Sequence, residues 1–204
     1  MRFGIITILF IVISFSEITG KRINEVNDSL SKEELSKIRD GDIILRYGYG
    51  IGSECIVRSF NELYQVSHCG IICKEDRGFS VISSISQSNA AFEGVQKQAI
   101  ERFFKDSQVH SLIVVRLKSS NSNYGNKIHN RAEYYNNKKI EFDHAYDIFD
   151  STKFYCSEFV WKVIMDEFNI DIFKNKYNEE KEYMKFANFW NPEYFEVIIN
   201  HNEK

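Results

Sequence analysis

The chain has 204 residues, of which 43% are hydrophobic and 15% aromatic, so it is long and apolar enough to bury a core. Twenty-six basic residues face 29 acidic ones, and the formal charge of -3 excludes the large basic field that a nucleic-acid partner requires. With 27% charged residues and one proline, the chain is neither a disordered tail nor a proline-rich linker. The composition predicts a compact, slightly acidic globular domain that binds or converts a small molecule.

The first 20 residues differ from the rest of the sequence. A single basic residue, Arg2, precedes an apolar run over residues 5–13, which is the pattern of a secretory signal. The run is shorter than the roughly 20 residues that span a bilayer. We expect cleavage after Ser16 or Gly20, a periplasmic or extracellular location, and no membrane span in the mature chain. A buried N-terminal strand or helix is the alternative.

No linker or internal repeat divides the remainder, so residues 21–204 are expected to form one domain. Ser31 and Glu34 have the spacing of a helix capping box. The G-x-G-x-G stretch at 48–52 lacks the strand–turn–helix context of a dinucleotide site and predicts a loop. Apolar patterning and turn residues predict these further elements: strands at 43–45 and 109–117, a hairpin of 68–73 with 81–85, and helices at 32–38, 99–104 and 126–137.

The clearest helix begins at Cys156. Apolar side chains recur after it at helical spacing and form one buried stripe: Phe159, Val160, Val163, Ile164 and Phe168. The tail from Asp171 is irregular in pattern, and its aromatic residues at 190, 194 and 195 are expected to pack back onto the core.

Cys156 is the candidate nucleophile, because the thiolate is the reactive form and the start of a helix lowers a thiol pKa. Its own backbone N–H could also stabilise an oxyanion. Of the five histidines, His68 is the candidate base because it begins a buried strand. Ser83 on the adjoining strand is expected almost opposite His68, where it could orient the ring. The structural alternative is that Cys156 is a small apolar core residue.

Four short motifs occur in an order that identifies a family. They are Gly41–Ile44, Ser67–Ile71, Phe142–Asp147 and Tyr155–Phe159, with Gln96–Gln98 in a matching middle region. The set resembles the circularly permuted papain-like hydrolases of the NlpC/P60 superfamily, in the YiiX/YebB-like branch, from about Asp40 to Met165. The resemblance implies an α+β fold in which an antiparallel sheet or barrel packs against the helix that carries the nucleophile.

The resemblance also implies a chemistry. Cys156 is the implied nucleophile and His68 the implied general base of a cysteine peptidase or amidase that needs no metal or organic cofactor. The family's third polar residue is usually Glu or His, and Ser83 occupies that position here. Tyr155, Glu158 and Asp143 are candidate substrate contacts, although Glu158 could instead cap the helix and Asp143 a turn. The implied substrates are small peptides, peptidoglycan fragments or acyl lipids.

Three alternatives compete with this interpretation. In an exported protein, Cys55 could form a disulfide with Cys69 or Cys73, whereas Cys69 and Cys73 are about 13 Å apart on one strand and cannot pair. A metal site at His68, Cys69 and Cys73 is disfavoured, since the first two point to opposite faces of the strand. Finally, the domain could bind a peptide or lipid without turnover, because Ser83 brings no charge to the histidine.

Overall fold

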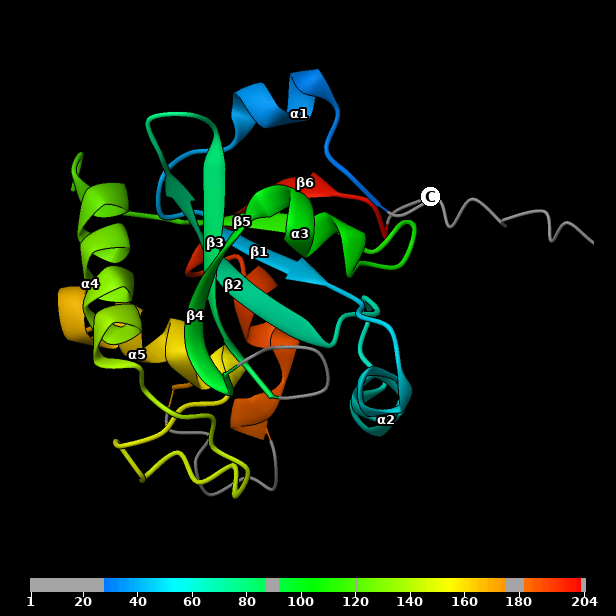
Figure 1. Cartoon of the computed structure of the whole chain (residues 1–204), viewed down its shortest axis with the longest axis vertical. Helices are drawn as coiled ribbons and strands as arrows, with labels where there is room; N and C mark the ends of the chain where they lie inside the picture. The colour runs from blue at the N-terminus through cyan, green and yellow to red at the C-terminus, as the bar shows by residue number, and fades with distance from the viewer. Residues whose placement is uncertain (1–27, 87–91, 120, 175–181, 203–204) are drawn as a thin grey trace, which may run out of the picture.

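The computed structural model describes residues 28–86, 92–119, 121–174 and 182–202, which form a six-stranded antiparallel sheet with helices on both faces (Figure 1). The strand order is β4-β3-β2-β1-β5-β6, so β4 and β6 are edges and the sheet does not close into a barrel. The strands are β1 (Ile43–Arg46), β2 (His68–Lys74), β3 (Phe79–Ile85), β4 (Gly94–Ala99), β5 (Ile113–Leu117) and β6 (Phe195–Asn200).

The two faces of the sheet carry separate apolar clusters. Helices α4 (Tyr124–Lys138) and α5 (Cys156–Phe168) cover one face, while α1 (Lys32–Lys37) and α3 (Ile100–Lys105) cover the other. The central strands serve both faces because successive side chains alternate: Ile43 and Leu45 of β1 join the cluster under α4 and α5, whereas Ile44 joins the opposite one. The 3₁₀ helices η2 (Glu182–Met184) and η3 (Phe186–Trp190) precede β6.

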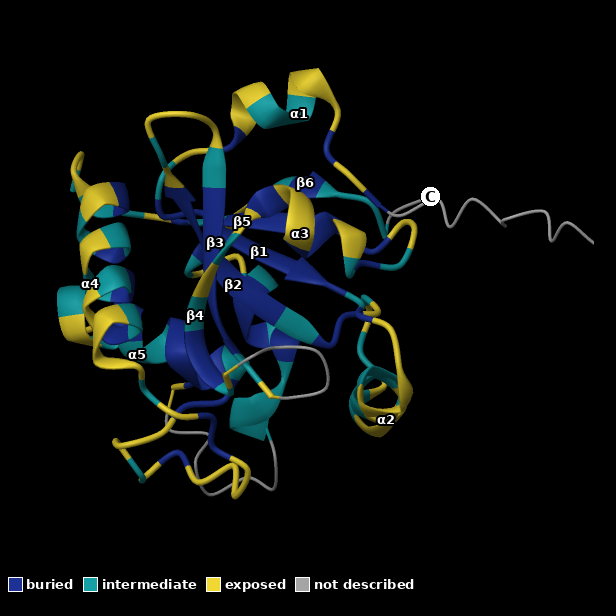
Figure 2. Cartoon of the chain, in the orientation of Figure 1, coloured by how far each residue is buried: buried dark blue, intermediate teal, exposed yellow. Residues whose placement is uncertain are grey.

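Helix α2 (Ile51–Phe60) lies at one end of the sheet, apart from both layers (Figure 1). None of its residues is buried (Figure 2). Ile51 at its start is 85% exposed. Ile56 and Phe60 make its contact with the core, where they are partly buried. Helix α2 therefore lies on the surface of the molecule and packs on the core through one face only.

Most of the elements expected from sequence are confirmed. Ser31 forms the capping box with Glu34, the hairpin is β2–β3, and helix α5 starts at Cys156. The aromatic tail packs back as predicted, with Phe195 buried and Trp190 beside the core. The predicted signal sequence lies outside the described residues.

Several boundaries were wrong. Helix α2 occupies part of the stretch expected to be a loop, and β4 and β6 were not predicted as strands. Strand β5 begins at Ile113 instead of residue 109, because His110 adopts a left-handed conformation (φ 59°) in a turn. Edge strands such as β4, whose exposed side chains alternate with half-buried polar ones, carry little apolar signal.

A buried ion pair fixes the start of β1 against β5. The Arg116 guanidinium donates from Nε and Nη2 to the two carboxylate oxygens of Asp42, at 2.8 Å each. The Arg39 backbone N–H donates to the same carboxylate at 2.7 Å. Burial raises the pKa of Asp42, and these hydrogen bonds oppose that rise. The Gly41–Ile44 motif therefore has a structural role at the centre of the sheet.

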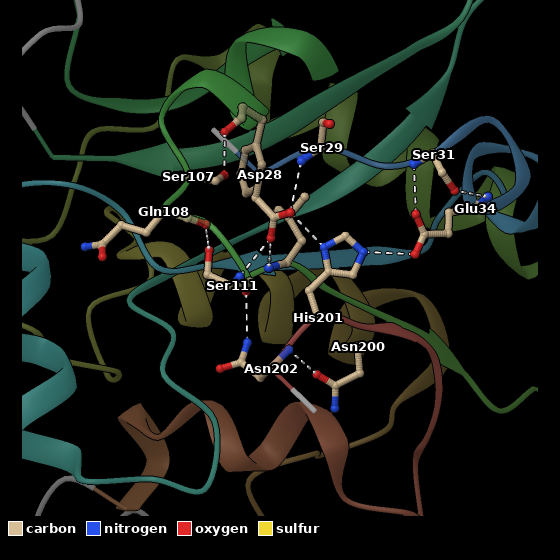
Figure 3. A network of polar contacts seen from close by, with 12 residues as sticks. Asp28, Ser29, Ser31, Glu34, Ser107, Gln108, Ser111, Asn200, His201 and Asn202 are labelled. Carbon is tan, nitrogen blue, oxygen red and sulfur yellow. Dashed lines mark hydrogen bonds and ion pairs between the residues drawn. The ribbon is translucent and has the colours of Figure 1, made fainter. Parts of the chain in front are cut away.

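A second polar network joins the two ends of the described chain (Figure 3). The His201 ring contacts Asp28 through Nδ1 at 2.8 Å and Glu34 through Nε2 at 2.9 Å. Asp28 also accepts the backbone N–H groups of Ser111 and Leu112. The His201 ring is therefore half-buried between two carboxylates, although it is the fourth residue from the end of the sequence.

Among the described residues, no helix is both long and apolar enough to cross a membrane.

Candidate active site

Cys156 is the first residue of α5 and is half-buried against the core cluster beneath that helix. Helix α5 packs on β2 and β3, and Ser84 near the end of β3 donates to the Phe154 carbonyl just before the helix begins. The unpaired N–H groups of this first turn point out of the helix toward any negative charge at the site. The sequence prediction that a helix begins at Cys156 is confirmed.

The Cys156 thiol has a pKa well below its usual range. The largest cause is a hydrogen-bond interaction with the Cys69 side chain; burial opposes it, and hydrogen bonding and charge from His68 lower the pKa further. The Cys69 thiol behaves in the opposite way, since burial raises its pKa and the neighbouring Cys156 thiolate raises it again. The position of Cys156 at a helix N-terminus and its interaction with His68 favour the thiolate on Cys156, with Cys69 as the donor.

His68 is held by Ser83, as the sequence predicted, but through a different register. The His68 Nε2 and the Ser83 Oγ are 3.2 Å apart. Strand β2 pairs Ile71 with Ile82, so continuing the ladder sets Ser83 beside Gly70, and not directly opposite His68. The contact is diagonal across the hairpin, which lies within reach of a long side chain.

Gly70 is the residue that makes this diagonal contact possible. A Cβ atom there would lie 2.6 Å from Cγ1 of Val81 and 2.9 Å from Cβ of Ser83, closer than real Cβ contacts. Because glycine has no side chain, Ser83 can lie against the strand and reach the His68 ring. Gly70 is therefore required for space, not for backbone conformation.

Arg46 is a further charged group beside the histidine, and no sequence pattern indicated it. It is the cross-strand partner of His68, is only 8% exposed, and stacks over Phe103 with its guanidinium carbon 4.6 Å from the ring centroid. The His68 ring lies 5.8 Å from the same centroid. Burial lowers the pKa of Arg46 to about 10, with Asp106 and the Cys156 thiolate opposing that shift. Arg46 thus adds a buried positive charge near the nucleophile.

The three residues predicted to contact substrate are all buried in this structure. Tyr155 and Glu158 are 2% and 1% exposed, and the Glu158 carboxylate accepts the Tyr155 backbone N–H at 3.2 Å. Asp143 accepts the backbone N–H groups of Ala145 and Asp147. These contacts match the capping alternatives considered for Glu158 and Asp143. Burial raises the pKa of Glu158 to about 9, with nearby Asp143 adding to the shift.

Tyr146 is a site residue that sequence reasoning missed, although it lies within the Phe142–Asp147 motif. Burial raises its hydroxyl pKa, and the Cys156 thiolate raises it further, which indicates that the two groups are close. Its ring lies 5.4 Å from that of Tyr155. The residue has a φ of 54°, a left-handed conformation that is uncommon outside glycine and is often found at functional sites.

Tyr146 also lines a cavity of about 390 Å³. Helix α2 supplies one wall through Cys55, Ile56, Ser59 and Phe60, and the other lining residues are Ala145, Tyr183 and Met184. The walls are mainly apolar and aromatic. Neither Cys156 nor His68 lines the cavity; Tyr146 connects it to the site, because its ring packs on Tyr155, the residue before Cys156.

The remaining cysteines are free thiols, so the possible pairing of Cys55 with Cys69 or Cys73 is not present in this structure. Cys55 is exposed on α2, whereas Cys69 and Cys73 are buried in β2. The separation of Cys55 from the two buried thiols follows from the position of α2 outside the helical layers.

One group of potential metal ligands occurs among the described residues, and it is not the group considered from sequence. Glu75, His129 and Glu133 converge at the β2–β3 turn and α4. The Lys97 ammonium lies 2.6 Å from Glu75 and 2.5 Å from Glu133, and His129 donates toward Asp40 at 2.8 Å. The Lys97 ammonium already bridges both carboxylates and occupies the place a cation would take, so this donor set does not fit a metal ion.

A low-pKa thiol at a helix N-terminus, beside a histidine on an antiparallel sheet, defines the class of papain-like cysteine hydrolases. The order of the two residues, histidine before cysteine, is the permuted one. The family model for the permuted papain-like amidases, YaeF/YiiX, C92 family, matches residues 37–198. The chain belongs to this family of enzymes.

Solved structures agree on the fold. The chain is similar to the crystal structure of metalloprotein yiiX from Escherichia coli O157:H7, with a TM-score of 0.56 and 19% identity. The likeness covers 67% of this chain and 69% of that one. No curated protein sequence matches the chain significantly. The permuted papain-like fold expected from the sequence motifs is therefore confirmed.

Proposed function

We propose that this chain is an exported cysteine amidase that cleaves an amide bond in a small peptide, such as a fragment of peptidoglycan. The observation that carries the proposal is the lowered pKa of Cys156, caused by Cys69 and His68, together with the 3.2 Å contact that holds the His68 ring on Ser83. Export is supported by the apolar run at residues 5–13, and it makes an external peptide an available substrate.

The proposed reaction has two halves. The Cys156 thiolate attacks the carbonyl carbon, and N–H groups at the start of α5 stabilise the negative charge that develops on the carbonyl oxygen. The C–N bond then breaks, with the His68 imidazolium giving its proton to the leaving amine. In the second half, His68 takes a proton from water, whose oxygen attacks the thioester and releases the acid from Cys156.

The contact on Nε2 leaves Nδ1 of His68 as the nitrogen that exchanges protons at Cys156. Ser83 is neutral, so it orients the ring but adds no charge to stabilise the imidazolium. Hydrogen bonding by Cys69 compensates in part, because it stabilises the thiolate without requiring a protonated histidine. We therefore propose that activity is retained although the usual charged third residue is absent.

A second candidate substrate class, acyl lipids, is favoured by one observation. The cavity beside Tyr146 is lined by Ile56, Phe60 and Met184, which suit an alkyl chain better than a polar peptide. The same Cys156–His68 chemistry would hydrolyse or transfer an acyl group held there. The two candidates differ in substrate and share the nucleophile.

Turnover of wall-derived peptides and of acyl lipids should be compared for the wild type, Cys156→Ala and His68→Ala. We expect product from one substrate class with the wild type only, detected by mass spectrometry. Alkylation with iodoacetamide should also label Cys156 faster than the exposed Cys55, and His68→Ala should reduce that preference. Equal products from wild type and Cys156→Ala would refute the enzyme assignment, and binding without turnover would favour a binding module.

A further inference from the structure

Two thiols of different character meet at the nucleophile. Cys69, Ile71 and Cys73 share the face of β2 that points toward α5, and Cys156 packs on the same cluster from the first turn of that helix. The start of α5 lies over Cys69, because Ser84, which continues the β2–β3 ladder beside Cys69, donates from Oγ to the Phe154 carbonyl two residues before Cys156. The side chain and the backbone N–H of Cys69 interact there with the Cys156 side chain. Cys69 is completely buried and Cys156 half-buried, so an oxidant from solvent meets Cys156 first.

We propose that Cys69 is a resolving cysteine for Cys156, and that oxidation of the nucleophile by a peroxide is captured as a reversible Cys69–Cys156 disulfide. The inference rests on the thiolate of the proposed function and is independent of which substrate that thiolate attacks. The disulfide removes the nucleophile while it persists and protects it from irreversible oxidation.

The chemistry needs one peroxide molecule for each disulfide. The Cys156 thiolate attacks one peroxide oxygen; the S–O bond forms, the O–O bond breaks, and hydroxide leaves. The Cys69 sulfur then attacks the sulfenic sulfur of Cys156; the S–S bond forms, the S–O bond breaks, and the departing hydroxide takes the Cys69 proton as water. Two thiols lose two electrons in total, and peroxide is reduced to water. An external thiol returns the pair to the reduced state.

The other cysteines are poor partners for Cys156. Cys73 lies four residues further along the same strand, about 13 Å from Cys69 in extended geometry. Its thiol is directed toward the Ile71 carbonyl at 3.8 Å, and burial raises its pKa. Cys55 is exposed on α2, which lies apart from the helix layer that carries Cys156. Cys69 is the cysteine whose thiol interacts with Cys156.

The test treats the reduced full-length protein with a small excess of hydrogen peroxide and maps the cysteines by mass spectrometry, before and after dithiothreitol. The wild type should give a Cys69–Cys156 peptide that has lost two hydrogen atoms, and dithiothreitol should restore the alkylatable Cys156. Cys73→Ala and Cys55→Ala are matched controls and should behave as the wild type does.

Cys69→Ala should instead accumulate sulfinic or sulfonic acid at Cys156, with at least about tenfold less thiol recovered after reduction. Cys69→Ser provides a second variant, since it keeps a hydroxyl donor beside Cys156 but cannot form a disulfide. Its melting temperature and its Cys156 alkylation rate before oxidation show that the site is folded. Full recovery in both Cys69 variants, or a disulfide from Cys156 to Cys55 in the wild type, would overturn the proposal. The readout is a peptide mass, so its failure is distinguishable from failure of the amidase assay.

Discussion

Replacing Ser83 with alanine tests the contact between Ser83 and His68. In related enzymes a charged residue is usual at the position of Ser83. Ser83 is completely buried, and its Oγ lies 3.2 Å from Nε2 of His68. The substitution removes one hydroxyl and leaves the size of the residue otherwise similar. Because a protonated His68 stabilises the Cys156 thiolate, loss of its partner should make that thiolate harder to form.

The magnitude follows from the kind of hydrogen bond that is lost. A neutral hydrogen bond contributes about 0.5–1.5 kcal/mol, and about 1.4 kcal/mol corresponds to a factor of ten. We expect Ser83→Ala to slow alkylation of Cys156 by about two- to twelvefold below the thiol's own pKa. The rates should converge at high pH, where the thiolate forms without help from His68. A charged partner would contribute about twice as much.

The assay is the rate of iodoacetamide labelling of Cys156 against pH, followed by mass spectrometry, and it requires no known substrate. Ser84→Ala is the matched control, since Ser84 is the next residue, is equally buried, and donates to the Phe154 carbonyl instead of to a histidine. It should lower stability without changing the shape of the pH profile. In a His68→Ala background, Ser83→Ala should have no further effect. The reasoning is refuted if the two serine variants have the same profile, or if the Ser83 effect persists without His68.

Three further outcomes follow from contacts described above. Asp28 raises the pKa of His201 from its usual 6.5 to about 9, and Glu34 adds to the rise. The stabilisation is therefore complete below about pH 6.5 and is lost as pH rises through 9. His201→Gln should cost about 1–2 kcal/mol at pH 6 after allowance for solvent screening, and urea melts at pH 6 and above pH 9 should show this difference shrinking. Arg116→Met leaves a buried carboxylate unpaired and should lower the free energy of unfolding by about 3 kcal/mol; a loss under half that size in urea melts would mean that the pair adds little. Gly70→Ala should cost about 1–3 kcal/mol by overpacking and should also slow Cys156 alkylation at neutral pH, and unchanged labelling would show that the hairpin accommodates the methyl group.

The position of the nucleophile could be predicted because its signals are local. The apolar stripe that begins at Cys156 is a property of one helix, and the alternation around His68 is a property of one hairpin. Both patterns survive into the structure as α5 and as the β2–β3 pair. Ser83 was also found, although its register was wrong, because the exact turn decides register and the polar residues between the strands allow several turns.

Other parts of the site have no local signal. Arg46 reads as the polar end of a short strand, and only the pairing of β1 with β2 brings it to His68. From the sequence, Cys69 was considered only as a disulfide partner of Cys55 or as a ligand in a disfavoured metal site. It nevertheless interacts with Cys156, because its side chain lies on the face of β2 that α5 covers. The cavity beside Tyr146 needs α2, a loop and η2 together, and these are distant in sequence.

The amino-acid sequence by itself determined the α+β class, the helix that carries Cys156, the strand that carries His68 and, through four ordered motifs, the family. These features depend on hydrophobic periodicity and on short motifs, both of which can be recognised in neighbouring residues of the sequence. The tertiary structure alone decided what surrounds the nucleophile: a thiol donor at Cys69, a buried cation at Arg46 and an apolar cavity. Such contacts depend on how a helix crosses a sheet, and crossing is settled by packing of the whole core, which no single segment specifies.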